Sequence, residues 1–444
     1  MTDIRVKLRE DAEKIYTGAI SACLPDTAVL EAMKEFRPPR GRIILVAIGK
    51  AAFRMAKCAA ESVKKMGHSI FSGVVITKYG HAEGKIEGVE IYEAGHPIPD
   101  ENGVIATERA LSVTENLTED DTVLFLVSGG GSALFESPNA PLYELSELTR
   151  ALLASGADIN EINAVRKHAS KVKGGRFAEH VSPAGIFAVV LSDVLGNRLD
   201  TVASGPAAPD KSTSFEALEI IRRYNINISE AMRAALSTET PKEVKNVSHV
   251  IAGSVGELCI CAKREAEALG YKTEIITDSE SGIASELGAR LAKLALEKSD
   301  TDIPLAFIVG GETVVKLNGT GIGGRNQETA LAAAPLIAGL ENVLVFSVGS
   351  DGTDGPTDAA GGMVTGESYG KMLAAGINPL RALDNNDSNT ALSAIGGLIV
   401  TGPTGTNVND VAAVLIAPTQ HVEGDETRRF SNLERVLNYG LKYK

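Results

Sequence analysis

The residues best suited to chemistry lie in two neighbouring segments of the second half of the chain. One is GGRNQE at residues 323–328, and the other is SDGTDGPTD at residues 350–358. The first segment brings Arg325, Asn326 and Gln327 to the start of an expected helix, where unpaired N–H groups bind anions. The second places three carboxylates after an expected strand, and carboxylates hold Mg²⁺ together with phosphate oxygens. These segments predict a site for an anion and a metal ion, as phosphoryl transfer requires.

Both segments also have plainer explanations. Arg325 follows two glycines and precedes two amide residues, an unusual composition for a simple helix start, and a guanidinium can grip a carboxylate or phosphate with two hydrogen bonds. Asp351, Asp354 and Asp358 would form Asx turns in the simpler interpretation, which explains one Asp better than three. A calcium-binding EF-hand is excluded because the later Glu is missing.

A lysine follows another expected strand in the first half of the chain. Gly49-Lys50 comes after the apolar run at 42–48 and opens an expected helix. Open α/β sheets bind ligands at the carboxyl ends of their strands, so Lys50 is placed to meet an anion. The alternative is a surface lysine at a helix start, although a cation there opposes the helix dipole.

A glycine-rich loop, SGGGSA at 128–133, also comes directly after an expected strand. Glycines let backbone N–H groups approach an oxyanion closely, and the serines add hydroxyl donors. No Gly-Lys-[Ser/Thr] sequence follows, so the loop is not a Walker A motif. A flexible linker is the alternative explanation. The residues expected to bind an anion here are Ser128, Gly129, Gly130, Gly131 and Ser132.

A basic segment and an acidic strand end complete the candidate residues. Residues 163–176 contain five cations and a His, among them Arg166 and Lys173, which predicts a local positive patch able to steer an anion. A solvated helix face explains such a run equally well. In LSDVLGN at 191–197, Asp193 ends a strand and could accept a proton from a substrate hydroxyl, or cap the next element.

Length and composition indicate a globular protein of two domains. The chain has 444 residues, which is long for a single core, and its net charge of −13 argues against a nucleic-acid partner. Its first residues lack the apolar run of a signal peptide, and no apolar segment reaches the roughly 18 residues of a membrane span. Four scattered cysteines fit a reducing cytoplasm, where we expect the protein to reside.

Short apolar runs alternate with amphipathic ones, which predicts an α/β fold with parallel strands. The runs are rich in Val and Ile without polar alternation, which indicates a sheet covered on both faces. The polar segment 238–242 suggests domains 1–240 and 241–417, with the tail 418–444 packed back on a domain, the first being the candidate. Expected strands are 42–48, 73–77, 122–127, 185–191, 249–252, 272–277, 305–309, 313–317, 343–348, a short one near 398, and 412–416; expected helices include 50–66, 255–269 and 283–298.

Nine segments together resemble the glycerate 2-kinase family, whose C-terminal part is called the MOFRL domain. They lie in order in both predicted domains, and together they are far more specific than a single glycine loop. The segments are AIGKAA at 47–52, SGGGSA at 128–133, NAVRKHASKVKGGRFA at 163–178, LSDVLGN at 191–197, SGP at 204–206, GGET at 310–313, GGRNQE at 323–328, SVGSDGTDGPTDAAGG at 347–362 and TGPTGTNVND at 401–410.

The resemblance implies an ATP- and Mg²⁺-dependent enzyme that phosphorylates the C2 hydroxyl of D-glycerate. It implies a Rossmann-like N-terminal domain with a parallel sheet and a smaller α/β C-terminal domain, with the active site in the cleft between them. The catalytic residues would be Lys50, Asp193 and Arg325, with Asp351 and Asp354 near the metal or the nucleotide. Substrate and nucleotide would also meet Ser128, Gly129, Gly130, Gly131, Ser132, Arg166, Lys173, Asn197, Asn326 and Gln327.

Two other functions remain open from the sequence. One is a reductase acting on hydroxypyruvate or tartronate semialdehyde, but Gly49 onward is not the G-x-G-x-x-G of a dinucleotide site. The other is a non-catalytic sensor of small carboxylates, which would not need both an Asp base and a carboxylate cluster. The sequence does not say which domain binds ATP, and a homodimer is compatible with it.

Overall fold

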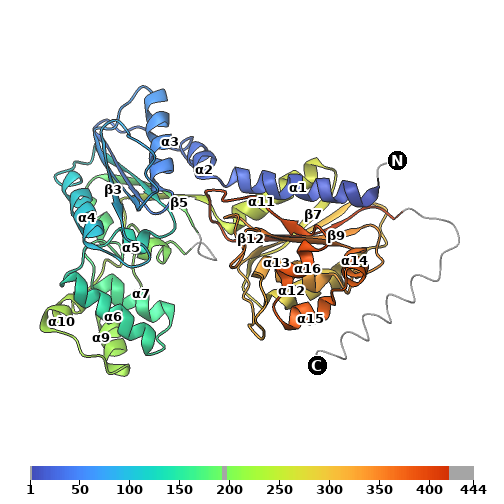
Figure 1. Cartoon of the computed structure of the whole chain (residues 1–444). Coiled ribbons are helices and arrows are strands. Elements are labelled where there is room, and N and C mark those ends of the chain that lie inside the picture. The colour runs from blue at the N-terminus through green and yellow to red at the C-terminus, as the bar shows by residue number, and fades with distance from the viewer. Residues whose placement is uncertain (1–2, 193–197, 420–444) are drawn as a thin grey trace. The chain divides into compact units, whose positions relative to one another are not determined.

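The computed structural model describes residues 3–192 and 198–419, which form two compact units (Figure 1). The first unit comprises the described residues from 25 to 253, and the second joins residues 3–24 to residues 254–419. This division differs from the predicted boundary at 240 in two respects. Strand β6 (Val247–Gly253) pairs with β5 (Gly185–Leu191) of the first sheet, and helix α1 (Ile4–Ala22) packs against α11 (Val255–Ala268) of the second unit.

The first unit is built on a six-stranded sheet in the order β3-β2-β1-β4-β5-β6. All neighbouring strands run parallel, as the sequence predicted. The strand order reverses between β1 and β4, and open α/β sheets bind ligands at the carboxyl end of such a reversal. Besides β5 and β6, the strands are β1 (Ile43–Ile48), β2 (Ser72–Lys78), β3 (Val89–Ala94) and β4 (Thr122–Val127).

Helices cover both faces of this sheet, which explains its unbroken apolar strands. Along β1, Ile44 and Ile48 enter a core with α4 and α8, whereas Leu45 and Ala47 enter a second core with α2 and α3. Four further helices form a separate apolar cluster of their own. The helices are α2 (Pro25–Ala32), α3 (Ala52–Lys65), α4 (Glu101–Val113), α5 (Gly131–Leu134), α8 (Arg176–Val181) and the 3-10 helix η2 (Val202–Ser204), and the separate cluster is α6 (Leu142–Ala154), α7 (Ile159–His168), α9 (Ser214–Arg223) and α10 (Glu230–Leu236).

The second unit contains a mixed sheet in the order β11-β10-β9-β12-β8-β7. Only β7 and β8 pair in parallel, and the other pairs are antiparallel. The predicted strand at 313–317 is wrong, because Val314 and Leu317 are 57% and 79% exposed and only Val314 makes an isolated bridge. The strands are β7 (Lys272–Glu280), β8 (Leu305–Gly311), β9 (Val343–Gly349), β10 (Gly361–Thr365), β11 (Leu398–Ile399) and β12 (Asp410–Ile416).

The two faces of the second sheet are covered by different helices. One face packs on α1 and α11, where the Tyr16 and Phe346 rings lie 5.8 Å apart. The other carries an aliphatic core that includes Leu291, Leu331 and Leu392. No helix among residues 3–192 and 198–419 is long and apolar enough to span a membrane. The remaining helices are α12 (Ala284–Lys298), α13 (Arg325–Ala333), α14 (Ser368–Ala374), α15 (Pro379–Asp384) and α16 (Ser388–Ser393).

Candidate functional site

The loops that follow β1 and β4 are hydrogen-bonded to each other at the strand-order reversal. The N–H of Lys50 donates to the carbonyl of Gly129 at 2.9 Å, and the N–H of Ser128 donates to that of Ile48 at 2.9 Å. The Ser128 hydroxyl is buried, accepts from the N–H of Ala51 at 3.1 Å and thereby holds the start of α3. Ser128 therefore fixes the two loops together, while the prediction placed it on a ligand.

Gly130 and Lys50 form the exposed part of this edge. Gly130 has φ +87°, and a Cβ at this position would lie 3.1 Å from Nε2 of His96 and 3.3 Å from Cγ of Lys50. Only glycine leaves room between these side chains. Lys50 is exposed, and its ammonium has no hydrogen-bond or ion-pair partner in the described part of the chain. The predicted anion-binding residues Lys50 and Gly130 thus lie together at the edge of the first sheet.

Ser132 connects the glycine loop to a strained segment after β5. Its hydroxyl lies 3.0 Å from that of Ser204, and its carbonyl accepts a hydrogen bond from Nη2 of Arg166 at 2.8 Å. Ala203 and Ser204 have φ values of +50° and +61°, a region that side chains rarely adopt. Such strain occurs where surrounding contacts fix the backbone, often at functional sites. Arg166, which was predicted to bind substrate, therefore stabilises the glycine loop by donating to the carbonyl of Ser132.

Lys173 lies behind the glycine loop in an ion pair that has no access to solvent. Its ammonium is 3.0 Å from the Glu136 carboxylate and donates to the carbonyl of Phe135 at 2.7 Å, with both charged side chains 0% exposed. Burial lowers the pKa of Lys173 to about 8, although Glu136 opposes this shift. The geometry therefore favours a supporting role for Lys173 over the predicted contact with substrate.

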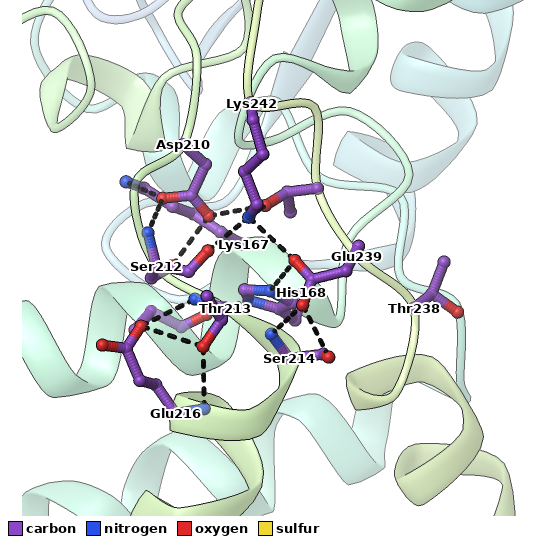
Figure 2. Close-up of polar contacts among 12 residues, drawn as sticks. Lys167, His168, Asp210, Ser212, Thr213, Ser214, Glu216, Thr238, Glu239 and Lys242 are labelled. Carbon is purple, nitrogen blue, oxygen red and sulfur yellow. Dashed lines mark hydrogen bonds and ion pairs between the residues drawn. The ribbon is translucent and has the colours of Figure 1, made fainter.

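The basic segment 163–176 is largely a buried network, so the expected positive patch is not found among its described side chains. Lys167 is 5% exposed and donates to Asp210 at 3.1 Å, and Asp210 also accepts from the hydroxyls of Ser212 and Thr240 (Figure 2). His168 is 0% exposed, and burial lowers its pKa. These contacts tie α7 to the chain that follows the strained segment. The solvated-face alternative is wrong for the same reason.

Two predicted residues, the base Asp193 and the binding residue Asn197, lie outside the described residues. Strand β5 ends at Leu191, beside the carboxyl end of β4. Their roles stay predictions.

In the second unit, Arg325 is gripped by two carboxylates of its own chain. Nε and Nη2 donate to the two Asp410 oxygens at 2.5 and 3.0 Å, and Nη1 lies 3.2 Å from Glu312. Burial raises the pKa of Asp410 to about 6, although its hydrogen bonds with Arg325 oppose the shift. Asn409 donates to Glu312 at 2.9 Å and holds that carboxylate. Arg325 is one-third exposed, so one side of the guanidinium stays open to a ligand.

Asn326 and Gln327 are both hydrogen-bonded to Asp354, and these contacts stabilise the start of α13. The Asp354 carboxylate accepts from the backbone N–H groups of Asn326 and Gln327 at 3.1 and 2.8 Å, so it caps a helix whose own N-cap is Gly324. The Gln327 amide donates to Asp354 at 3.0 Å, and the Asn326 carbonyl accepts from Ser347 at 2.5 Å. Because Asn326 and Gln327 are 1% and 0% exposed, they are placed to position Arg325 and not to touch substrate.

The acidic turn does not fit the predicted metal site in this conformation. Both oxygens of Asp354 are used by the helix start, and burial raises the pKa of this carboxyl. Asp351 accepts from the N–H of Thr353 at 2.9 Å, which is an Asx turn. No group of three His, Cys, Asp or Glu side chains within residues 3–192 and 198–419 is arranged to hold a metal ion. The Mg²⁺ prediction therefore gains no protein ligand.

Several residues of these sites escaped the sequence reasoning. Glu312 and Asp410 stand at the ends of recognised segments, but nothing in their spacing shows that both face Arg325. Glu136 follows the glycine loop by only four residues, and its burial is a tertiary effect. His96 follows β3, a strand the pattern missed because it is a half-exposed edge strand with two glutamates. A His-Pro pair after that strand was the available signal.

The fold and these loops define the class first: an α/β protein with a Rossmann-type parallel sheet, carrying a lysine and a glycine-rich loop at the reversal of strand order. Comparison with known proteins then makes this specific. The family model described as "Domain of unknown function (DUF4147)" matches residues 11–237, and that of the MOFRL family matches residues 305–410.

Curated relatives cover nearly the whole chain. D-glycerate 2-kinase of Thermotoga maritima is 52% identical over 415 residues, covering 92% of this chain and 98% of the relative. A crystal structure of glycerate kinase from Thermotoga maritima, 52% identical, has a TM-score of 0.87 and covers 93% of this chain and 100% of that one. A putative hydroxypyruvate reductase of Agrobacterium vitis is 40% identical, covering 94% of this chain and 96% of the relative. The chain belongs to the glycerate 2-kinase family.

Proposed function

We propose that this protein transfers the γ-phosphoryl group of ATP to the C2 hydroxyl of D-glycerate, giving 2-phosphoglycerate and ADP. The observation that carries the proposal is the position of Lys50 beside Gly130 at the sheet reversal, in a chain 52% identical to a D-glycerate 2-kinase; the Lys50 ammonium has no partner among the residues that the structure describes. Both substrates carry negative charge, and an exposed lysine whose Cγ lies 3.3 Å from the place of a Gly130 Cβ suits an anionic group of either one.

The proposed step exchanges one P–O bond for another. The C2 oxygen of glycerate attacks the γ-phosphorus, the bond to the bridging oxygen of ADP breaks, and the hydroxyl proton passes to a base, for which Asp193 is the candidate. Lys50 and Arg325 would offset the charge of the carboxylate and of the transferring phosphoryl group. Mg²⁺ commonly binds nucleotide phosphates, so we expect it to arrive with ATP and assign it no residue.

The assay that tests this proposal couples product formation to enolase. With ATP, Mg²⁺ and D-glycerate, turnover with enolase alone is expected, because enolase consumes 2-phosphoglycerate directly. Turnover that requires added phosphoglycerate mutase would show that the enzyme phosphorylates C3, and it would contradict the proposed regiochemistry.

The reductase alternative predicts a different result when the protein is assayed with hydroxypyruvate and NAD(P)H. The loop after β1 reads Gly49-Lys50-Ala51-Ala52, which has one glycine where a dinucleotide loop has three. NAD(P)H oxidation by hydroxypyruvate without any ATP consumption would establish that activity and remove the kinase. Binding of D-glycerate with neither reaction would establish the sensor.

A further inference from the structure

His96 is the histidine of the first unit whose surroundings least resemble a structural role. Its ring is partly buried in the bend that follows β3. Neither ring nitrogen has a hydrogen-bond partner among the residues the structure describes. By contrast, His81, His168 and His180 each place a ring nitrogen 2.9–3.1 Å from a backbone carbonyl oxygen. A polar ring without a protein partner, held at a ligand-binding edge, is available to a ligand.

The position of the ring is fixed relative to the open glycine. A Cβ on Gly130 would lie 3.0 Å from Cδ2 and 3.1 Å from Nε2 of His96, so the Nε2 edge borders the space above Gly130. The same absent side chain would lie 3.3 Å from Cγ of Lys50. His96, Gly130 and Lys50 therefore border one small volume, which a larger residue at position 130 would fill.

The electrostatics of this volume favour an anion. Partial burial lowers the pKa of His96, and the nearby Lys50, Lys78 and His81 lower it further, so the ring is mostly neutral at pH 7. A neutral imidazole carries one N–H donor, and an anion bound between His96 and Lys50 would offset the positive charge that Lys50 and Lys78 bring to this place.

We propose that the imidazole of His96 donates a hydrogen bond to an anionic oxygen of a substrate that Lys50 also holds above Gly130. The inference rests on the proposed function, because that function supplies two anionic substrates. The oxygen belongs to the glycerate carboxylate or to a nucleotide phosphate, and these have the same hydrogen-bonding chemistry. His96 is thus a binding residue for the reaction that the sequence did not reveal.

The test measures the KM for each substrate in His96→Ala, with the exposed His68→Gln as the matched control. Loss of a hydrogen bond to a charged group should raise one KM about 10- to 100-fold, while kcat changes little. A raised KM for D-glycerate identifies the carboxylate, and a raised KM for ATP identifies a phosphate. Unchanged KM values, or a loss in kcat alone, would overturn the proposal.

A second pair of variants separates binding from folding. His96→Gln keeps an N–H donor and should restore part of the lost affinity, whereas His96→Phe keeps a ring without a donor and should lose as much as Ala. Melting temperatures show which variants are folded, and a folded Phe variant with wild-type KM values would overturn the inference.

A titration without turnover distinguishes this inference from the proposed function. Calorimetry with pyrophosphate tests a phosphate oxygen, and calorimetry with D-glycerate tests the carboxylate. The wild-type protein should bind one of these two ligands more tightly than His96→Ala does, by about the same factor of ten or more. If the wild type phosphorylates no glycerate but this difference persists, the proposed function fails and the role of His96 stands. If the wild type phosphorylates glycerate and His96→Ala changes neither a KM nor the affinity for either ligand, the proposed function stands and the role of His96 fails.

Discussion

The loop edge of the first unit and the Arg325 region of the second arrange their cations in opposite ways. At the loop edge, the Lys50 ammonium and the His96 ring have no protein partner among the described residues. Around Arg325, two carboxylates already hold the guanidinium, and buried amides fix the helix beneath it. Free cations bind an incoming anion directly, whereas a held cation is pre-oriented and binds only with its open side. The two regions therefore suit binding and positioning, respectively.

The largest effect is expected for the buried ion pair of Lys173 and Glu136, which lies behind the glycine loop. Breaking this pair tests whether it stabilises the loop edge. Glu136→Leu leaves the Lys173 ammonium buried without its counter-charge, so unfolding free energy should fall by about 3–5 kcal/mol. Urea unfolding measures the loss. The matched double variant, Glu136→Leu with Lys173→Met, should recover most of it, since no unpaired charge remains.

The same pair predicts a pH dependence. The pKa of Lys173 in the folded protein is lowered to about 8, below the unfolded value of about 10.4. The unfolded chain therefore binds more protons between these values, and the stability of the wild type relative to the double variant should increase with pH from about 8 to 10. A flat difference would show that Lys173 is not desolvated.

The Arg325 region is tested by shortening its fork. Arg325→Lys keeps the charge but loses the two-pronged contact with Asp410, so kcat/KM should fall about 100-fold. Asp410→Asn removes half of the grip and should cost about tenfold. Enolase-coupled kinetics give both values. Wild-type kcat/KM in Arg325→Lys would show that a held cation is not needed there.

Gly130 sharpens the comparison from the side of the loop edge. Gly130→Ala places a Cβ against His96 and Lys50 and should raise KM for one substrate about tenfold. Gly156→Ala is the control, because Gly156 has φ +78° but no atom within 4 Å of a Cβ. Both variants carry similar backbone strain, so only Gly130→Ala should lose affinity. Equal losses would attribute the effect to folding.

Asp354 gives the smallest expected change and separates a helix cap from a metal ligand. Asp354→Asn weakens the cap on α13, so unfolding free energy should fall by about 1 kcal/mol. The Mg²⁺ concentration that gives half-maximal activity should be the same for Asp354→Asn as for the wild type. Asp351→Asn, measured in the same way, is the control. A large increase for Asp354→Asn would return this residue to the metal.

The sequence predicted strands β1, β2, β4 and β5 of the first sheet because local pattern determines them, whereas β3 was missed and β6 was assigned to the second domain. Fully buried strands such as β1 and β4 appear in the sequence as unbroken apolar runs, and loops after parallel strands gather at one edge, so the sequence already predicted that Lys50 and Gly130 lie at this edge. In the second sheet, the sequence predicted strands at the places of β7, β8, β9, β11 and β12 but missed β10, since β10 is five residues long and begins with two glycines. Exposed Val and Leu in the 313–317 loop imitated a strand.

The side-chain contacts were less predictable, because polar residue types do not reveal their partners. Lys173 looked like a substrate cation, yet it is buried against Glu136, and Asp354 looked like a metal ligand, yet it caps α13. In both cases a residue far along the chain or in a neighbouring element takes up the polar group. His96 was missed for the opposite reason, since its importance lies in having no such partner.

The kinetics of Lys50→Met in the enolase-coupled assay test the central claim most directly. Methionine keeps most of the length of the side chain and removes only its charge, so the fold should be retained and the melting temperature should stay close to that of the wild type. The account predicts that kcat/KM for D-glycerate falls about 100-fold or more, because the free cation of the loop edge is lost. A folded Lys50→Met protein within about threefold of wild-type kcat/KM would contradict it, since threefold is only about 0.7 kcal/mol.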